Sequence, residues 1–212
     1  NPQIDTVISY EGEKTFSELV SALYAQRDLD DCLGISYRDR HGKIHVNNPR
    51  DPILDLDSFP YPSRDIHEKV HQKYLYIAGS RGCLGNCAFC GETSAKKYSK
   101  PKYVRSRSAD SIVNEIEYLV KKYNIFAYRM TDATFEDPGE EGFIRANAIF
   151  DKITSRKLCI SLHLFTRGEL VVNEPDEYFQ KARRAGTECF YIGVESGNNT
   201  DLKLYNKKTS VD

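Results

Sequence analysis

The feature that most constrains the fold is a regular alternation of apolar and amphipathic segments after residue 73. Four apolar segments predict strands, at Tyr74–Ala78, Ile125–Met130, Leu158–Leu164 and Cys189–Val194. Strands that alternate with helices pair in parallel through right-handed crossovers. Because these strands are nearly unbroken apolar runs, we expect a parallel sheet that is covered on both faces.

The segments between the strands have the spacing and end signals of helices. Ser108 is predicted to cap a helix with one apolar face, formed by Ile112, Val113, Ile116, Leu119 and Val120. A second helix is predicted through Phe143, Ala146, Ile149 and Ile153. A third begins near Pro175 and ends at Gly186, because proline favours helix starts and glycine favours helix ends. The fold class is therefore α/β.

The residues before this alternation predict a smaller unit. Residues 4–9 predict a buried strand, and residues 11–25 predict a helix in which Thr15 and Glu18 have capping-box spacing. The helix carries an apolar stripe of Phe16, Leu19, Val20 and Leu23. One strand and one helix are too little for a core of their own.

A hairpin and a proline-rich segment follow. Residues 33–48 predict a hairpin that turns at His41–Gly42. Four prolines between Pro49 and Pro62 predict an extended connector. We therefore predict three parts, a first unit at 1–48, a linker at 49–72 and a second unit at 73–212.

Charge and targeting signals narrow the function classes. The chain has 30 Lys and Arg against 31 Asp and Glu, so no overall field favours nucleic acid or an anionic membrane. No apolar run approaches membrane-spanning length, and the start lacks a secretion signal. We expect a cytoplasmic protein without membrane contact, where clustered thiols are more often metal ligands or catalysts than disulfide partners. Because Met130 is the only methionine, we expect a fragment.

Polar side chains follow every predicted strand. Cys83 lies shortly after the first strand, Asp132 after the second and Arg167 after the third. Glu195 and Ser196 follow the fourth. Since ligands of parallel α/β folds bind beyond the carboxyl ends of the strands, we expect these residues to meet at one rim and form an active site.

Three cysteines, Cys83, Cys87 and Cys90, lie in "RGCLGNCAFCG", a loop whose glycines let a short segment curl its sulfurs toward one centre. A structural zinc ion takes four ligands, and no fourth Cys or His lies nearby in the sequence. A four-iron four-sulfur cluster normally takes four thiolates, so three would leave one iron open. The other cysteines are predicted to be structural, with Cys159 and Cys189 buried in strands and Cys32 elsewhere.

The stretch "GCLGNCAFC" resembles the cluster motif of the radical S-adenosylmethionine (SAM) enzymes, with an aromatic residue, Phe89, before the third cysteine. The resemblance implies that the three cysteines hold a 4Fe-4S cluster and that SAM binds the fourth iron. It also implies reductive cleavage of SAM to a 5'-deoxyadenosyl radical, a small-molecule substrate, and an electron donor such as flavodoxin or ferredoxin. The expected fold is a partial (β/α) radical SAM barrel of about four parallel units.

Four segments in order resemble the branch of this family that carries an N-terminal cobalamin-binding domain, namely "IDTVISYEGEKTFSELVSAL", "DLDSFPYPSRD", "GSRGCLGNCAFC" and "YIGVESGNNTDLKLYNKKTS". The resemblance implies that the first unit is the last strand and helix of a Rossmann-like domain. It also implies that a longer parent binds cobalamin as a further cofactor and methylates its substrate, or that the reaction is a rearrangement or an oxidation if cobalamin does not take part. The cobalamin motif D-x-H-x-x-G is absent, because Ile44 follows Asp39 and His41 where glycine is needed.

The same resemblance implies contacts to SAM. Phe89 would lie near the adenine, and Glu195, with Ser196, would contact the ribose or the amino group. Asp132 matches an acidic position of the branch, and the Arg167 fork would pair with the SAM carboxylate. Loop packing for Phe89, a helix cap or ion pair for Glu195, and a surface ion pair for Arg167 stay open as alternatives.

A basic segment after the third cysteine has two interpretations. It runs from Ser94 to Ser108 and contains Lys96, Lys97, Lys100, Lys102, Arg105 and Arg107. In a tRNA methylthiotransferase-like enzyme, this segment would bind RNA phosphates. In the second interpretation, it forms a solvated loop near SAM. The neutral charge balance favours the second, without a nucleic-acid partner. A non-catalytic iron-sulfur or zinc module is the remaining alternative. His67, His71 and His163 are predicted to be structural.

Overall fold

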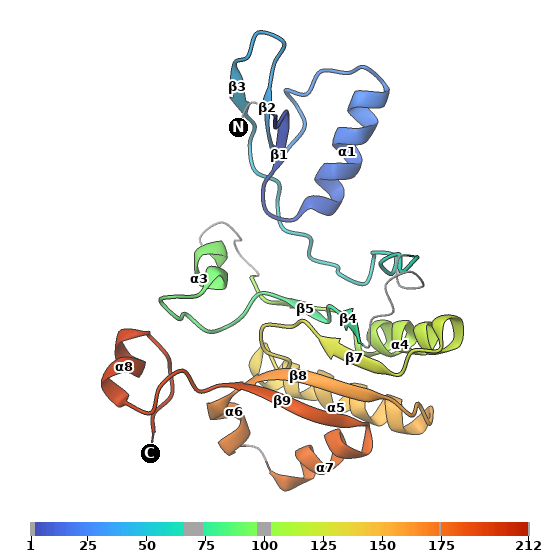
Figure 1. The fold of residues 1–212 in the computed structure, drawn as a ribbon, viewed down its shortest axis with the longest axis vertical. Coiled ribbons are helices and arrows are strands. Elements are labelled where there is room, and N and C mark those ends of the chain that lie inside the picture. Colours follow the sequence, from blue (N-terminus) through green and yellow to red (C-terminus); the bar gives the residue numbers. More distant parts are fainter. Residues whose placement is uncertain (1–2, 66–73, 97–102, 174, 212) are drawn as a thin grey trace. The chain divides into compact units, whose positions relative to one another are not determined.

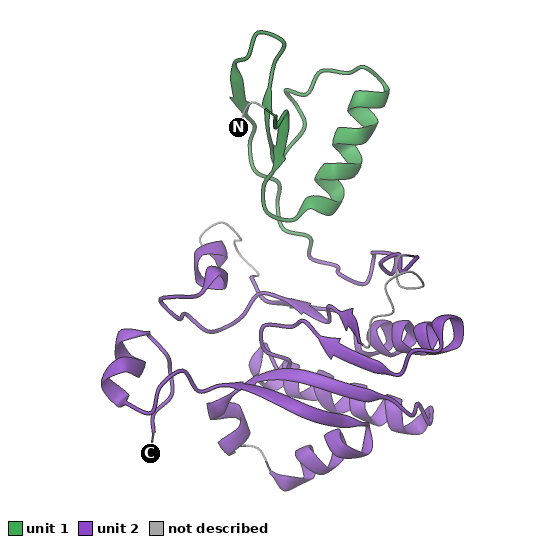
Figure 2. Ribbon diagram, in the orientation of Figure 1, with its two compact units in different colours: residues 1–53, 98–101 green, residues 54–97, 102–212 purple. Residues whose placement is uncertain are grey.

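The computed structural model describes residues 3–65, 74–96, 103–173 and 175–211. The chain forms two compact units, the first up to residue 53 and the second over the described residues from 54 onwards (Figure 2). Residues 54–65 of the predicted linker thus group with the second unit, while His67 and His71 lie outside the described residues. No described helix is long and apolar enough to cross a membrane.

The second unit is built on a four-stranded parallel sheet with the order β4-β7-β8-β9 (Figure 1). The strands are β4 (Leu75–Ile77), β7 (Ala127–Met130), β8 (Ser161–Arg167) and β9 (Thr187–Gly193). Each neighbouring pair is parallel, and the order in space follows the order in the sequence. The predicted α/β fold with four parallel units is confirmed.

Three long helices cover one face of this sheet, α4 (Ala109–Tyr123), α5 (Gly139–Ser155) and α7 (Asp176–Arg184) (Figure 1). Their apolar faces meet the strand residues that point to the same side. The core of this face includes Ile77, Ile112, Ile116, Tyr128, Ile149, Phe150, Leu162 and Leu164. The helix-face pattern predicted from the sequence is therefore confirmed for α4 and α5.

The prediction that the sheet is covered on both faces is wrong for the described residues. Side chains alternate along each strand, and those opposite the helices include Tyr76, Arg129, Phe165 and Tyr191. Tyr76 is 47% exposed and Phe165 is 36% exposed. Because aromatic residues count as apolar in a sequence pattern, these strands looked like runs buried on both sides.

The ends of the helices follow their end signals. The Ser108 hydroxyl accepts a hydrogen bond of 3.1 Å from the Ser111 N–H, which confirms it as the cap of α4. Gly186 has a φ of 92°, and a Cβ there would lie 2.0 Å from the Ile160 carbonyl oxygen. Only glycine fits between α7 and β9. Strand β8 begins later than predicted because the Leu158 N–H still bonds the Ile153 carbonyl at the end of α5.

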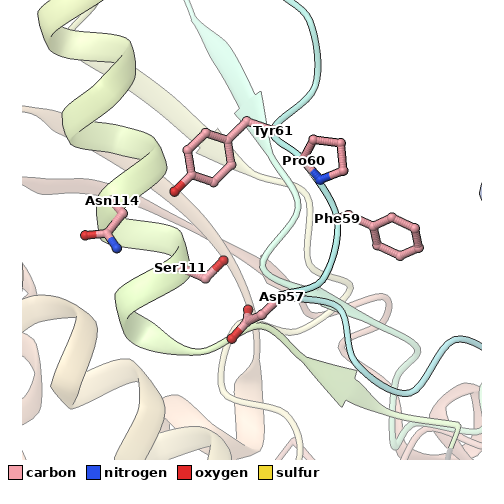
Figure 3. Close-up of a pocket in the computed structure, with 6 residues that line it drawn as sticks. All are labelled: Asp57, Phe59, Pro60, Tyr61, Ser111 and Asn114. Carbon is pink, nitrogen blue, oxygen red and sulfur yellow. The ribbon is translucent and has the colours of Figure 1, made fainter.

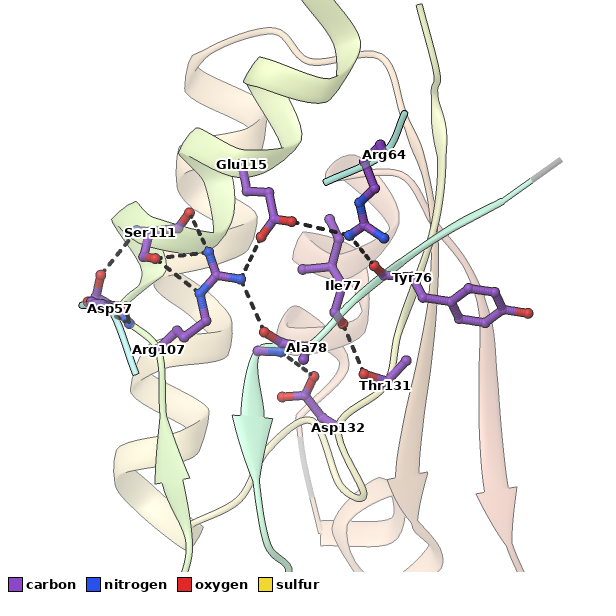
Figure 4. Close-up of polar contacts among 12 residues, drawn as sticks. Asp57, Arg64, Tyr76, Ile77, Ala78, Arg107, Ser111, Glu115, Thr131 and Asp132 are labelled. Carbon is purple, nitrogen blue, oxygen red and sulfur yellow. Dashed lines mark hydrogen bonds and ion pairs between the residues drawn. The ribbon is translucent and has the colours of Figure 1, made fainter. Parts of the chain in front are cut away.

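An ion-pair network joins residues 57–64 to α4 (Figure 4). The buried Glu115 carboxylate pairs with Arg107 at 2.5 Å and with Arg64 at 3.3 Å. Arg64 also donates to the Tyr76 carbonyl at 2.7 Å, and Asp57 accepts from the Ser108 N–H at 3.0 Å. These contacts explain why residues 54–65 belong to the second unit. An unpaired Glu115 would be costly at this burial, so both arginines stabilise it.

Five short elements of the second unit have no strong sequence pattern. They are β5 (Ser80–Arg81), α3 (Gly91–Lys96), β6 (Arg105–Ser106), α6 (Gly168–Asn173) and α8 (Asn199–Leu204). Strands β5 and β6 form an antiparallel pair, so the segment after β4 is held beside the segment that enters α4. Elements of two to six residues give too few periodic positions to be read from sequence.

The first unit contains a three-stranded antiparallel sheet and one helix. Strand β1 (Thr6–Ile8) pairs with β2 (Ile35–Arg38), which pairs with β3 (Ile44–Val46). The hairpin prediction for residues 33–48 is confirmed. Because Asp39 receives hydrogen bonds from the N–H groups of His41 and Lys43 in the turn, these residues serve the hairpin.

Three details of the first unit differ from prediction. Helix α1 (Gly12–Tyr24) lies within the predicted range and has Glu11 at its N-cap, but the Thr15 hydroxyl donates to the Leu33 carbonyl instead of capping. Strand β1 is not buried, since Val7 is 51% exposed. Of the predicted stripe on α1 only Leu19 is buried, whereas the others, Phe16, Val20 and Leu23, are exposed.

Candidate metal centre

The cysteines lie on the loop between β5 and α3, where glycines set the backbone path. Gly82 has a φ of 88°, and a Cβ there would lie 2.5 Å from the Tyr103 carbonyl oxygen. A Cβ on Gly85 would lie 3.2 Å from the Cys83 sulfur and 3.8 Å from the Cys87 sulfur. These two sulfurs therefore flank one point of the backbone that a larger residue would fill.

Helix α3 braces the other end of the loop. The Cys90 N–H donates to the Cys87 carbonyl at 3.2 Å, and the Thr93 hydroxyl donates to the same carbonyl at 2.8 Å. The Lys96 ammonium reaches back and donates to the Gly85 carbonyl. These bonds hold all three cysteines in one short curled segment.

The first cysteine is anchored at the rim by residues that follow β7 and by the last residue of β8. The Cys83 sulfur lies 3.7 Å from the Thr134 hydroxyl. The buried Asp137 accepts a hydrogen bond of 2.8 Å from the Leu84 N–H and pairs with Arg167 at 3.1 Å. Of the residues expected to meet at one rim, Arg167 thus reaches the Cys83 loop through Asp137, whereas Asp132 bonds Gly79 and Ser80.

The thiols are in a state that permits metal binding. All six cysteines are free, so no disulfide ties the loop. Burial raises the pKa of the Cys83 thiol, while the Gly85 N–H bond opposes that rise. Bound iron would reverse this balance, because a metal stabilises the thiolate. Among the described residues no group of three or more Cys, His, Asp or Glu is gathered closely enough for a single metal ion.

The chemistry of the donors on this loop fits an iron-sulfur cluster. A 4Fe-4S cluster takes one thiolate at each of several irons, so its sulfur ligands surround a larger object than one ion. Cys83, Cys87 and Cys90 offer three free thiols on one glycine-rich loop, and the Cys83 and Cys87 sulfurs both lie near Gly85. The roles of Cys83, Cys87 and Cys90 as ligands remain predictions.

A segment from the end of the described chain lies against the cysteine loop. The Ala88 N–H donates to the Tyr205 carbonyl at 2.8 Å, and the Asn206 amide donates to the Asn86 carbonyl at 2.8 Å. The Phe89 and Tyr205 rings make an edge contact with centroids 5.7 Å apart. Because Phe89 is still 58% exposed, its ring has a free face for a ligand.

Glu195 and Ser196 are held by the residues around α8. Glu195 has a φ of 65°, and its carboxylate pairs with Lys207 at 3.1 Å. The Ser196 hydroxyl donates to Asp201 at 3.0 Å. The Glu195 side chain is 34% exposed, so it remains open to a ligand, whereas Ser196 serves the turn before α8. Their SAM contacts stay predictions.

Asp132 and Arg167 both have protein partners. Asp132 is 1% exposed and accepts hydrogen bonds from the Gly79 N–H at 2.9 Å and the Ser80 hydroxyl at 2.5 Å. Burial raises the pKa of Asp132, against the pull of the Arg145 charge. This environment supports a positioning role for Asp132 at the end of β4. Arg167 also pairs with Glu169 at 3.0 Å. Contact of either residue with SAM stays a prediction.

Sequence reasoning missed four residues that shape this site, Thr134, Asp137, Tyr205 and Lys207. Thr134 and Asp137 belong to the same loop as Asp132, so the rule that polar residues follow strand ends applies to them also. Tyr205 and Lys207 had no such signal, because their roles depend on how the chain folds back after β9.

The remaining cysteines differ from one another. Cys32 is 3% exposed, as expected of a structural thiol, and Cys189 is half-buried. Cys159 is exposed, so its prediction as a buried strand residue is wrong. The cause is the late start of β8, which leaves Cys159 in the turn after α5.

Some residues of the basic segment make contacts within the protein. Lys96 bonds the cysteine loop, Arg105 is 7% exposed, and Arg107 pairs with Glu115. Lys97, Lys100 and Lys102 lie outside the described residues.

His163 is 9% exposed, within β8. An open hollow of about 400 Å³ lies beside α4 and shares no residue with the candidate site (Figure 3).

The second unit is a parallel β/α fold with three free thiols on one loop, and comparison with known families identifies its class. The radical SAM superfamily profile matches residues 77–212. The chain belongs to the radical SAM superfamily.

Known relatives are similar along nearly the whole chain. An uncharacterized methyltransferase of Pyrococcus horikoshii is 33% identical over 97% of this chain and 43% of its own length. The anaerobic magnesium-protoporphyrin IX monomethyl ester cyclase of a Synechocystis strain is 30% identical over 100% of this chain and 42% of its own length. The chain thus spans less than half the length of these relatives.

Solved structures agree with the fold. The cobalamin-dependent SAM radical enzyme OxsB, with aqua-cobalamin and SAM bound, superposes with a TM-score of 0.80 and 27% identity, over 97% of this chain and 30% of OxsB. The radical SAM methyltransferase TsrM of Kitasatospora setae gives 0.72 at 18% identity, over 94% of this chain and 39% of TsrM, which supports the fold alone. The resemblance to the cobalamin-containing branch is confirmed.

Proposed function

We propose that the protein is a radical SAM enzyme in which Cys83, Cys87 and Cys90 hold a 4Fe-4S cluster and SAM occupies the remaining iron. The observation that carries the proposal is the set of three free thiols on one curled loop at the carboxyl ends of a parallel sheet, in a chain of this superfamily. When bound, the cluster supplies the electron that cleaves SAM to a 5'-deoxyadenosyl radical.

The chain's own residues position these groups. Thr134 and Asp137 fix the first cysteine, and the loop glycines keep space beside the sulfurs. The Glu195 carboxylate gives up its ion pair with Lys207 and accepts hydrogen bonds from the SAM ammonium or ribose instead. The exposed face of Phe89 covers the adenine.

Methylation with cobalamin is the reaction class that the relatives favour. A named methyltransferase is 33% identical, and OxsB is described as cobalamin-dependent. The substrate is a small molecule, and the electron comes from a donor such as flavodoxin or ferredoxin. The similarity to a cyclase makes an oxidative reaction the second candidate.

Anaerobic reconstitution with iron and sulfide tests the proposal. We expect about four irons per chain and a change in the electron paramagnetic resonance signal of the reduced cluster when SAM is added. Cys87→Ala should lose the cluster, whereas Cys159→Ala, a change of the same size at an exposed free thiol, should keep it. Equal iron loss in both variants would contradict the ligand assignment.

The two alternatives give different results in this experiment. A non-catalytic iron-sulfur or zinc module would show no spectral response to SAM. A methylthiotransferase-like enzyme is suggested by 26% identity to a putative methylthiotransferase of Methanocaldococcus jannaschii. It would respond to SAM and also bind tRNA, but Lys96, Arg105 and Arg107 are engaged or buried. We therefore expect no tRNA binding in a gel-shift assay.

A further inference from the structure

The sheet face opposite the helices carries a layer of polar and aromatic side chains that the cluster site does not use. One row across the sheet pairs Tyr76 with Arg129, Arg129 with His163 and His163 with Cys189. Figure 4 shows the Tyr76 ring on the side of β4 away from α4, whereas Ile77 points toward the helices. This face therefore belongs to the interior side of the β/α unit, below the rim.

Arg129 is the centre of this layer. Its guanidinium carbon lies 5.0 Å from the centroid of the Tyr191 ring, 5.7 Å from that of Tyr74 and 5.9 Å from that of Tyr76. It donates one hydrogen bond of 2.7 Å to the Tyr191 hydroxyl, which also lies 3.2 Å from His163 Nδ1. The aromatic rings hold the guanidinium in place, and the Tyr191 hydroxyl accepts from one of its several N–H donors.

The charge of Arg129 has no carboxylate partner within the described part of the chain, and its Nε is buried without an acceptor. Other arginines of the same unit do pair with carboxylates, namely Arg64, Arg107, Arg145, Arg156 and Arg167. A half-buried guanidinium without an anion is unfavourable unless a ligand supplies the anion. Its fork geometry suits a carboxylate or a phosphate.

The position of Arg129 along β7 relates it to the cysteine loop. Thr131 and Asp132 directly follow β7, which ends at Met130, and Thr134 lies beside Cys83. Because a strand rises about 3.3 Å per residue, Arg129 lies about 7 Å below the level of Thr131. A ligand anchored at Arg129 would extend up along Phe165 and Tyr191 toward the rim, where the radical chemistry takes place.

We propose that Arg129 binds the anionic group, a carboxylate or a phosphate, of the small-molecule substrate, and that the rings of Phe165 and Tyr191 contact its planar or apolar body. These two rings stack at 4.9 Å and form an apolar wall beside the cation. The assignment rests on the proposed function, because it takes the ligand of this face to be the substrate. It names a substrate class that family membership leaves open.

Calorimetric titration of the reconstituted protein with three probes of similar shape tests the assignment. Benzoate and phenyl phosphate carry the two candidate anions, and benzamide is a neutral control. We expect at least one anion to bind about tenfold more tightly than benzamide, because charge-assisted hydrogen bonds exceed neutral ones. The preferred anion distinguishes a carboxylate substrate from a phosphate substrate.

Three variants locate the binding. Arg129→Gln should weaken binding of the preferred anion about tenfold, and Arg129→Lys should retain part of it. Arg156→Gln, which removes a guanidinium paired with Glu117 on the helix side, should leave it unchanged. If Arg129→Gln does not fold, the comparison of anions with benzamide on the native protein decides. Equal affinity for all three probes, or unchanged affinity in a folded Arg129→Gln, overturns the proposal.

The response to SAM separates this proposal from the function on which it rests. Iron content and the SAM-induced spectral change are measured in the same samples, and both should be unchanged in Arg129→Gln. A native protein that responds to SAM but does not prefer an anion overturns the anion site alone. A native protein with no response to SAM overturns the enzyme function, whichever probes it binds.

Discussion

The two faces of the parallel sheet differ in what they contribute. The helix face is closed, with side chains such as Phe150 and Leu164 at 0% exposure. The opposite face, with Arg129 and Tyr191, presents charge and hydroxyl groups on rings that are partly exposed. The same four strands thus supply stability on one side and recognition chemistry on the other. Alternation of side chains along a strand makes this division possible.

The largest expected effect tests the division by stability. Phe150 lies on α5, and its ring packs against those of Phe135 and Tyr178. Phe150→Ala should lower the free energy of unfolding by about 3–5 kcal/mol, because it leaves a cavity in a closed core. Phe165→Ala makes the same chemical change on the opposite face and should cost about 1 kcal/mol, mainly the stacking with Tyr191. Denaturant unfolding of both variants measures the difference. Similar losses would mean that the opposite face is also a packed core.

The next prediction concerns a buried carboxylate on the helix side. Burial raises the pKa of Glu136, whose carboxylate accepts a hydrogen bond of 2.8 Å from the Tyr178 hydroxyl. Because the pKa of Glu136 is higher in the folded protein than in the unfolded chain, its contribution to the free energy of unfolding is complete below the ordinary glutamate pKa of about 4.3. That contribution is lost as the pH rises through the folded-state pKa. Glu136→Gln keeps an acceptor for Tyr178 and removes the ionisation. We therefore expect a flatter stability profile above pH 4 in that variant.

Glu141→Gln is the matched control for this pH profile, because Glu141 is exposed on α5 and its replacement changes the same atoms. At a single pH, this exposed substitution should change the free energy of unfolding by no more than about 0.5 kcal/mol. Asp132 is also buried with a raised pKa, so a smaller slope of the same sign should remain in Glu136→Gln. An identical profile for Glu136→Gln and the native protein would show that Glu136 does not titrate with folding.

The strands and helices of the second unit were predictable because their signals are repeated many times. Ile112, Ile116 and Leu119 each indicate the same helix face, and four separate strands indicate the alternation of strands and helices. The location of Cys83 at the rim followed from that architecture. The first unit was harder, since the role of Thr15 depends on the Leu33 carbonyl from a distant part of the chain.

The details of the site depend on long-range contacts that a local pattern does not contain. The pairing of Glu195 with Lys207 requires the chain to turn after β9 and return through α8. Burial of Asp132 requires the Gly79 backbone to lie against it. Arg129 looked like an ordinary strand residue, and only the register with Tyr76 and His163 places it among rings.

The smallest expected effect compares two tyrosine hydroxyls on the two faces. Tyr128, on the helix face, is fully buried and donates to the Ile125 carbonyl at 2.5 Å. Tyr128→Phe should cost about 1 kcal/mol, because it leaves that carbonyl without its partner. Tyr191→Phe removes bonds to Arg129 and His163, but water can replace them on a partly exposed face. Its effect on unfolding should stay within about 0.5 kcal/mol.

The effects of these two variants on anion affinity should have the opposite order to their effects on stability. Tyr191→Phe frees the guanidinium that its hydroxyl orients, so benzoate or phenyl phosphate affinity should change by a few-fold, whereas Tyr128→Phe should leave affinity unchanged. Thermal unfolding and calorimetric titration on the same two variants measure both orders. If Tyr191→Phe destabilised the fold more than Tyr128→Phe and left anion binding unchanged, the face that carries Arg129 would be structural. The division of labour between the two faces would then have to be abandoned.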